Sequence, residues 1–229
     1  QNRALSIDRL REEILINASR EQSKYDIIAC DLPWFGEMAD AGHFIPLDGF
    51  MNETGFDAAD FNKEAMASSR FKGQQYGIPI QTTPELLVCR QDVFQEMGLK
   101  YPETTQQLLD AAYAIQRSSI RMKAIAWNAA RGTPLGHSFL FSMGSFGQPI
   151  INLRKVENGF DAEWPKGEEL RPMFVTDAAR DVCDFFAELI SLSPQNILNM
   201  SWFERARAYA NGEVGMAFTA TLLSPMFEF

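Results

Sequence analysis

Apolar residues recur at helical spacing near the start of the chain, at Leu10, Ile14 and Ala18, and they predict an amphipathic helix over 6–20. The next apolar run, 25–30, is short and predicts a strand. The chain therefore opens with a helix followed by a strand.

A second helix is predicted from Asp31 to about Ala41. Asp31 is a favourable N-cap residue, and Pro33 is tolerated in a first helical turn. Gly42 follows the expected end of this helix, where a left-handed conformation is common. The segment 42–48 is then a loop that returns to the core.

Helices and strands continue to alternate along the rest of the chain. The expected strands are a hairpin over 71–77 and the runs 86–89, 124–127 and 214–218. The expected helices are 92–97, a helix capped by Thr104, the run 135–143, a helix capped by Thr176 and a helix that begins with the Ser201 to Glu204 capping box and ends before Gly212. The polar, irregular stretch 150–173 predicts a surface excursion. This alternation predicts an α/β fold with mostly parallel sheets.

The stretch after Tyr76 indicates a crossing between two structural units. Gly77 and Pro79 interrupt the backbone, and the polar segment 81–85 precedes the apolar strand 86–89. We therefore expect residues 1–82 to belong to one unit and 83–229 to another, with a hinge near 80–85. Small-molecule sites favour clefts between such units.

Composition narrows the classes of function. The chain has 229 residues, 46% of them hydrophobic, and a net charge of −9 from 21 basic and 30 acidic residues. It holds no polybasic run, so nucleic acid is not an expected partner. No apolar stretch approaches the roughly 20 residues of a membrane helix, and no signal peptide is visible.

The cysteines and histidines predict neither a metal site nor a redox centre. Cys30, Cys89 and Cys183 form no Cys-x-x-Cys pattern; a disulfide framework is not expected, although a Cys30–Cys89 bridge is left open. His43 and His137 are the two histidines of the chain, which limits triads and metal sites. The chain also lacks the nucleophile, zinc, phosphate and dinucleotide motifs of common enzymes.

Four segments together resemble a known family. They are Tyr25–Trp34 with Ala41–Asp48, the block Tyr76–Thr104, Gly144–Gly147, and Trp202–Glu204 with Tyr209–Met216. In this order and spacing they resemble the bacterial solute-binding proteins of ABC importers, in the carbohydrate-type extracellular family. The resemblance covers nearly the whole chain.

The resemblance implies a two-lobed periplasmic-binding-protein fold, type II-like, in which each lobe is a mostly parallel sheet flanked by helices. It implies a sugar or polyol ligand trapped in the inter-lobe cleft by hinge closure, and delivery of that ligand to the permease subunits of an importer. It implies no cofactor, no metal and no catalysis. The location implied is periplasmic or anchored at the cell surface, peripheral to the membrane.

Members of the family are longer than this chain. We therefore expect an internal portion with an incomplete N-terminal lobe, in which a first strand and helix precede Gln1 and further helices follow Phe229.

In the first unit, Asp31 and Trp34 are candidate ligand residues. Carbohydrate sites combine aromatic rings for flat sugar faces with polar side chains for hydroxyl groups. Asp31 follows the strand predicted over 25–30 and suits a hydroxyl, but it equally suits the N-cap of the next helix. Trp34 suits stacking on a sugar or packing of that helix.

The crossing supplies the candidates Gln81, Thr82, Thr83 and Glu85. A polar run between apolar segments needs hydrogen-bonding partners, which a cleft supplies. The two threonines serve equally well to satisfy backbone groups of the hinge.

In the second unit the candidates follow predicted strands or an apolar helix. They are Asn128, Arg131, Phe146, Thr219 and Thr221. Turn chemistry for Asn128, a solvated charge for Arg131 and a core position for Phe146 are the alternative interpretations. His137 is expected to be structural.

The small hydroxyl side chains at 219 and 221 stand where the family often has a tryptophan or aspartate, which favours a monosaccharide or small polyol over an oligosaccharide. Three other functions stay open. One is a ligand-free interaction or sensory module built on the same fold, which the sequence does not separate from a transport component. A glycoside-processing enzyme needs a carboxylate pair at a fixed separation, and no pair is marked in the sequence. A quaternary ammonium or amino-acid-derived solute is the third alternative, with Trp34, Trp127 and Trp202 as an aromatic cage.

Overall fold

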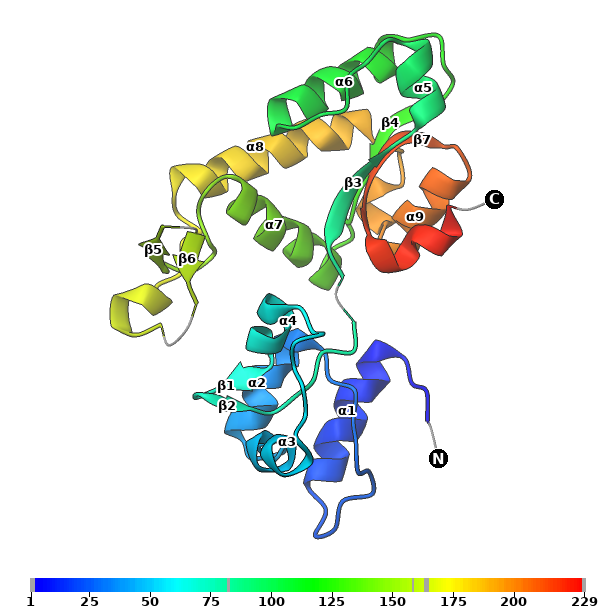
Figure 1. Cartoon of the computed structure of the whole chain (residues 1–229). Helices are drawn as coiled ribbons and strands as arrows, with labels where there is room; N and C mark the ends of the chain where they lie inside the picture. The colour runs from blue at the N-terminus through cyan, green and yellow to red at the C-terminus, as the bar shows by residue number, and fades with distance from the viewer. Residues whose placement is uncertain (1–2, 82, 158, 163–164, 228–229) are drawn as a thin grey trace. The chain divides into compact units, whose positions relative to one another are not determined.

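The computed structural model describes residues 3–81, 83–157, 159–162 and 165–227 (Figure 1). The chain divides into two compact units, Gln1–Thr82 and Thr83–Phe229. The boundary between the units lies within the polar segment 81–85.

Unit 1 is mostly helical. Its elements are α1 (Ile7–Ala18), α2 (Leu32–Asp40), α3 (Asp48–Thr54), α4 (Lys63–Ser68), β1 (Arg70–Phe71) and β2 (Gln74–Gln75). The helices α1 and α2 and the β1–β2 hairpin confirm the predictions for 6–20, 31–41 and 71–77. The helices α3 and α4 lie in a stretch for which no element was predicted.

The side chain of Gln75 ties the parts of unit 1 together. Its Nε2 donates to the Gly77 carbonyl at 2.6 Å and to Ser69 Oγ at 2.8 Å. Its backbone N–H donates to Asp48 Oδ2 at 3.0 Å. Because a buried amide is stable only when it is hydrogen-bonded, the side chain fixes β2 against the end of α4, while the backbone N–H holds the start of α3.

The strand predicted over 25–30 is wrong, since this segment has no regular secondary structure and belongs to no sheet. A strand needs a neighbour that accepts its backbone hydrogen bonds, and none of the described residues pairs with it. Within the described part of unit 1, the sheet consists of the antiparallel β1–β2 hairpin.

Unit 2 has a sheet covered by helices. Its elements are β3 (Glu85–Cys89), α5 (Gln91–Glu96), α6 (Thr105–Arg117), β4 (Lys123–Ala126), α7 (Thr133–Ser145), β5 (Arg154–Val156), β6 (Gly159–Asp161), η1 (Gly167–Leu170), α8 (Asp177–Leu192), η2 (Ile197–Asn199), α9 (Trp202–Ala210), β7 (Val214–Ala220) and η3 (Thr221–Met226). In Figure 1, α6 and α8 lie to one side of the sheet and α9 to the other.

The main sheet has the order β3-β7-β4. β4 runs parallel to β7, as predicted, but β3 runs antiparallel to it. The expectation of a mostly parallel sheet is therefore corrected to a mixed sheet. Alternation of helices and strands does not fix the direction of an edge strand, and mixed sheets commonly carry an antiparallel one at the edge.

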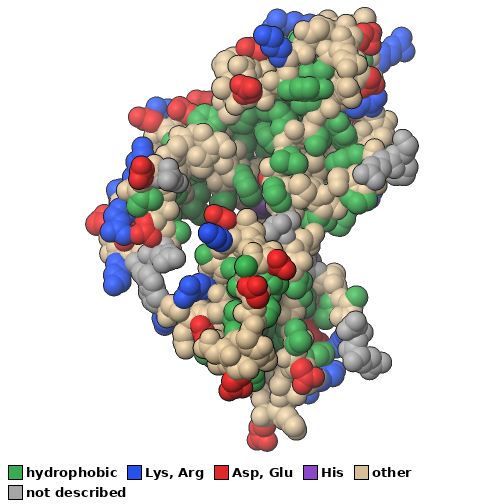
Figure 2. Space-filling model, in the orientation of Figure 1, with side chains coloured by type: hydrophobic (Ala, Val, Ile, Leu, Met, Phe, Trp, Pro, Cys, Tyr) green, Lys and Arg blue, Asp and Glu red, His purple; other side chains and the backbone are tan. Residues whose placement is uncertain are grey.

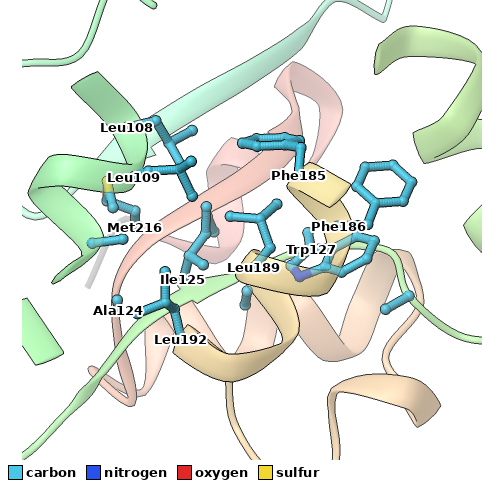
Figure 3. Close-up of a cluster of buried hydrophobic side chains, with 14 of the residues drawn as sticks. Leu108, Leu109, Ala124, Ile125, Trp127, Phe185, Phe186, Leu189, Leu192 and Met216 are labelled. Atoms are coloured by element: carbon cyan, nitrogen blue, oxygen red, sulfur yellow. The ribbon is translucent and has the colours of Figure 1, made fainter. Parts of the chain in front are cut away.

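A hydrophobic core lies in unit 2, between the sheet and its helices. Ile125 of β4, Met216 of β7 and Leu189 of α8 are each fully buried in it (Figure 3). Trp127 packs on Phe186 with ring centroids 4.7 Å apart. The burial of apolar surface by α6 and α8 holds these helices on the sheet.

Polar side chains cap the N-termini of the helices at the positions that the sequence predicts. Thr104 Oγ1 accepts from the Gln107 N–H, and Thr176 Oγ1 from the Ala179 N–H, each at 3.2 Å. At the start of α9 the Ser201 N–H donates to Glu204 Oε2 at 3.2 Å, and the Ser201 hydroxyl donates to the same oxygen, which lowers the pKa of the Glu204 carboxyl. These contacts satisfy N–H groups that lack partners within the helix.

The stretch 150–173 carries more structure than predicted. β5 and β6 form an antiparallel hairpin, and Ile151 bridges to Pro172. The hairpin was not predicted because its strands are only three residues long and mostly exposed, so they leave no apolar alternation.

Candidate functional site

A cavity of about 470 Å³ opens in unit 2 between the beginning of β3, the beginning of α6, and helices α7 and α8. Figure 2 shows hydrophobic side chains gathered over this part of unit 2. Pockets for small molecules typically measure about 300–1,000 Å³ and combine an apolar lining with a few polar groups. The size of the cavity therefore suits a small solute.

Aromatic side chains form much of the cavity lining. Trp127, Phe141, Phe146, Phe185, Phe186 and Phe218 all contribute. The indole Nε1 of Trp127 donates to Ser193 Oγ at 3.1 Å, so the polar edge of this buried ring is satisfied. Phe146 packs on Phe185 with centroids 5.9 Å apart. These contacts give the cavity a fixed apolar surface.

Hydroxyl groups supply most of the polar part of the lining. They come from Thr104 and Thr105 at the start of α6 and from Ser138, Ser142 and Ser145 on α7. The Ser138 hydroxyl donates to the Asn128 carbonyl at 2.8 Å, which ties α7 to the loop after β4. Glu85 and Glu103 bring carboxylates, and among the described residues no Lys or Arg lines the cavity.

The carboxylate of Glu85 is held by a buried guanidinium. Arg205 of α9 donates through Nη1 to Glu85 Oε1, and through Nη2 to Oε2 at 3.3 Å. The side chain of Arg205 is 1% exposed and that of Glu85 12%. Glu85 therefore reaches the cavity, while Arg205 lies behind it.

Three buried polar side chains around the same end of the sheet have unsatisfied atoms. They are both amide atoms of Asn128, Nε of Arg205 and Oγ1 of Thr219. Buried polar atoms normally have hydrogen-bonding partners, and leaving one unpaired costs about 1–3 kcal/mol. All three residues are buried, and none of them is part of the cavity lining.

Backbone contacts place these side chains at one end of the sheet. Thr219 pairs with Leu86 across the β7–β3 ladder. Asn128 lies two residues beyond Ala126, whose ladder partner is Ala217, and so reaches the level of Thr219. The N–H groups of Ala129 and Ala130 donate to the Met200 carbonyl, just before α9.

The predicted candidates of unit 2 occupy different environments. Glu85 and Phe146 line the cavity, and Asn128 and Thr219 are buried at the sheet end. Thr83 and Arg131 are exposed, and Thr221 begins η3 with its N–H bonded to the Pro84 carbonyl at 3.1 Å.

Two positional expectations for these residues are corrected. Thr219 lies inside β7 rather than after it, because the ladder with β3 continues to Ala220. Glu85 likewise begins β3 instead of belonging to the loop before it.

The candidates of unit 1 lie at the start of α2 and in the segment just before the boundary of the units. Asp31 is the N-cap of α2, and its carboxylate accepts from the Leu32 N–H at 3.1 Å. Trp34 is half-buried in α2, and Gln81 is exposed. Thr82 lies outside the described residues.

Arg205 is one of the site residues that the sequence did not predict. It stands between Glu204 and Ala206, two positions before the exposed Arg207, so the local sequence does not distinguish the buried arginine from the exposed one. A buried arginine needs a buried acceptor. The sequence does not reveal that the acceptor is Glu85, 120 positions earlier.

Thiol and metal chemistry find no support in the described residues. Burial raises the pKa of both the Cys30 and the Cys89 thiol to about 11, whereas a nucleophilic cysteine needs a lowered pKa. All three cysteines are free, with Cys183 exposed.

The described part of the chain holds no cluster of metal-ligating side chains. None of the helices described is long and apolar enough to cross a membrane.

Comparison with known proteins gives a family match. The family model of the bacterial extracellular solute-binding protein matches residues 6–221. No curated protein sequence matches the chain.

Solved structures share the fold. A solute-binding protein of Agrobacterium radiobacter K84 in complex with ribitol is 17% identical, with a TM-score of 0.82 over 99% of this chain and 54% of that one. A protein of Agrobacterium vitis S4 with bound D-mannitol is 21% identical, with a TM-score of 0.73 over 96% of this chain and 50% of that one.

A third structure, from Thermotoga lettingae TMO with bound α-D-tagatose, is 19% identical, with a TM-score of 0.77 over 96% of this chain and 53% of that one. The chain thus spans about half the length of these structures. At these identities the likeness shows the fold, and it confirms the α/β class and the binding-protein fold that the resemblance implied.

Proposed function

The chain belongs to the bacterial extracellular solute-binding protein family, and on that premise we propose that it is the substrate-binding component of an ABC importer for a sugar or polyol. The observation that carries the proposal is the family match over residues 6–221. The ribitol, D-mannitol and α-D-tagatose named for the solved structures support the same class of ligand.

The chemistry of unit 2 supports a neutral, hydroxyl-bearing ligand. Aromatic rings and hydroxyl side chains line the same cavity, and the carboxylate of Glu85 reaches it. Sugars and polyols present both CH faces, which pack on rings, and hydroxyls, which donate to carboxylates and exchange hydrogen bonds with Ser and Thr. We propose Glu85, Phe146, Asn128 and Thr219 as the contribution of unit 2 to binding.

A transport function of this kind works by a change of conformation and involves no covalent chemistry. A ligand that binds one conformational state more tightly than another shifts the population toward that state, and a permease that distinguishes the two states accepts the loaded protein. The partner in this proposal is the permease of the importer, and the location is extracytoplasmic. Asp31, Trp34, Gln81, Thr82, Thr83, Arg131 and Thr221 remain proposed ligand residues of the whole protein.

Two alternatives have less support. Hydrolysis of a glycoside needs two carboxyl groups that are free to act on the scissile bond, and both oxygens of Glu85 are already bonded to the Arg205 guanidinium. A tryptophan cage for a quaternary ammonium ion needs exposed ring faces, and Trp127 is 1% exposed.

The proposal is tested by thermal shift and isothermal titration calorimetry with ribitol, D-mannitol, D-glucitol, tagatose, maltose, glycine betaine and an amino-acid mixture. A ligand at about 100 times its Kd stabilises the folded state by about 2.7 kcal/mol. Stabilisation by sugars or polyols with no product formed is the expected result. Stabilisation by betaine or an amino acid alone would overturn the ligand class, and release of a new sugar from maltose would overturn the assignment to transport.

A further inference from the structure

We propose that Arg205 is a positioning residue of the binding site: it orients Glu85, and the Glu85 carboxylate makes the site selective for neutral hydroxyl-bearing solutes over anionic ones. This inference rests on the proposed function. The two residues lie on different elements, α9 and β3, and meet at the end of the sheet.

Burial separates the roles of the two side chains. Glu85 lines the cavity and is 12% exposed, whereas Arg205 is 1% exposed and does not line it. A solute in the cavity can therefore reach the carboxylate but not the guanidinium. Any effect of Arg205 on the solute passes through the orientation and charge of Glu85.

The guanidinium fixes the carboxylate in a defined orientation. Nη1 donates to one oxygen of Glu85 and Nη2 to the other, a fork that a lysine cannot reproduce with its single nitrogen. Each carboxylate oxygen keeps a lone pair for another donor, such as a ligand hydroxyl. The pair is thus an oriented acceptor and not a free charge.

The backbone of α9 holds Arg205 in place. Its N–H donates to the Ser201 carbonyl at 3.1 Å in the first turn, and Ser201 is in turn bonded to Glu204. The preceding Met200 carbonyl accepts from the loop after β4. The position of Arg205 therefore depends on the backbone hydrogen bonds that join the start of α9 to the loop after β4.

The charges of the pair cancel, and the other carboxylate of the cavity lining is that of Glu103. The hydroxyl groups of α6 and α7 add donors and acceptors, and among the described residues no Lys or Arg lines the cavity. Such a lining suits a ligand group that both donates and accepts, which a hydroxyl does and an anionic carboxylate or phosphate does not. Removal of Glu85 alone would leave the positive charge of Arg205 uncompensated.

The test is a double-substitution cycle in the full chain with two matched probes. Glu85→Gln, Arg205→Gln and the double variant are titrated calorimetrically with D-glucitol, and with D-gluconate, in which one terminal CH2OH is replaced by a carboxylate. Arg207→Gln, an exposed arginine on the same helix, is the control and should leave both affinities unchanged. Ribitol and D-mannitol replace D-glucitol as the neutral probe if the wild type prefers them, with the matching aldonates as anions.

We expect Arg205→Gln and Glu85→Gln each to weaken polyol binding about ten- to a hundredfold, the range of a lost charge-assisted hydrogen bond. The double variant should be no weaker than Glu85→Gln alone. Glu85→Gln should raise the affinity for the aldonate relative to the polyol about tenfold or more. A merely structural role would not change this ratio in a folded protein.

Unchanged polyol affinity in a cooperatively folded Arg205→Gln variant would overturn the proposal, as would additive effects in the double variant. If Arg205→Gln does not fold, Arg205→Lys keeps the charge and loses the fork; affinity equal to wild type in that variant would contradict positioning. Failure of the wild type to bind any polyol or sugar would instead overturn the proposed function, and this inference with it.

Discussion

Arg205 of α9 and Glu85 of β3 form an ion pair across 120 positions of the sequence, with side chains that are 1% and 12% exposed. The pair joins the first residue of the sheet after the boundary between the units to the helix that packs on β7. A buried pair of this kind is a weak net stabiliser, but removal of one partner leaves a buried charge without compensation.

Replacement of Arg205 by Ala should therefore destabilise unit 2 by about 3–5 kcal/mol. Urea titration followed by circular dichroism measures the change. Arg207→Ala, on the exposed face of the same helix, should stay within about 0.5 kcal/mol of wild type. Equal losses in the two variants would contradict the assigned burial of the pair.

Substitution of Ser193 by Ala should cost about 1–3 kcal/mol, because it leaves the buried indole N–H of Trp127 without an acceptor. The exposed Ser191, whose hydroxyl donates to the Glu188 carbonyl at 2.7 Å, supplies the matched control. Ser191→Ala should change the free energy of unfolding by less than about 0.5 kcal/mol. A change in Trp fluorescence that appears only with Ser193→Ala would support the contact independently.

Two glycines of unit 2 should respond in opposite directions to substitution by Ala. A Cβ at Gly215 would lie 2.9 Å from Cδ1 of Ile115, which is fully buried, so overpacking should cost about 1–3 kcal/mol. A Cβ at Gly136 on α7 meets no atom within 4 Å, and Ala there should stabilise the helix by about 0.4–1 kcal/mol. Denaturant unfolding of both variants checks the packing of α6 against β7; a neutral Gly215→Ala would contradict it.

Stability should fall as pH rises from about 8.5 toward 11. Burial raises the pKa of Cys30 and of Cys89 to about 11 in the folded protein, whereas an unfolded cysteine ionises near pH 8.5. Between these values the unfolded chain binds fewer protons than the folded one, so the free energy of unfolding decreases. Urea titrations at several pH values, compared with a Cys30→Ala/Cys89→Ala variant, measure the effect, and an equal slope in both proteins would contradict it.

Asp31→Ala separates a cap from a ligand contact. Loss of the N-cap of α2 should cost about 1 kcal/mol of stability in unit 1. We also expect weaker polyol binding, as proposed for this carboxylate. Lower stability with unchanged affinity, measured by calorimetry on the same sample, would leave Asp31 with the capping role alone.

The sequence predicts well those features that depend on neighbouring residues. Capping side chains at Asp31, Thr104 and Thr176 mark where α2, α6 and α8 begin, because a cap acts within one helical turn. Apolar runs likewise predict β3, β4 and β7. The strand prediction for 25–30 failed because a strand depends on a partner strand, which the segment itself does not specify.

The candidate site was predicted in part for the same reason. Glu85 and Phe146 were identified by residue type and by position near predicted elements, and both line the cavity. The hydroxyl side chains of α7 were not identified, although Ser138, Ser142 and Ser145 share one helical face. Their place in the cavity lining depends on the packing of α7 near β3 and α6, which the sequence of α7 does not specify.

By itself, the sequence determined the family, the α/β class and the ends of most helices, since these follow from local hydrogen bonding and from periodic burial. Only the tertiary structure decided that β3 runs antiparallel to β7, that Thr219 lies inside the ladder and that Arg205 compensates Glu85. Each of these depends on which distant segments meet. The packing of the whole core determines these contacts between distant segments, and no single stretch of the chain specifies them.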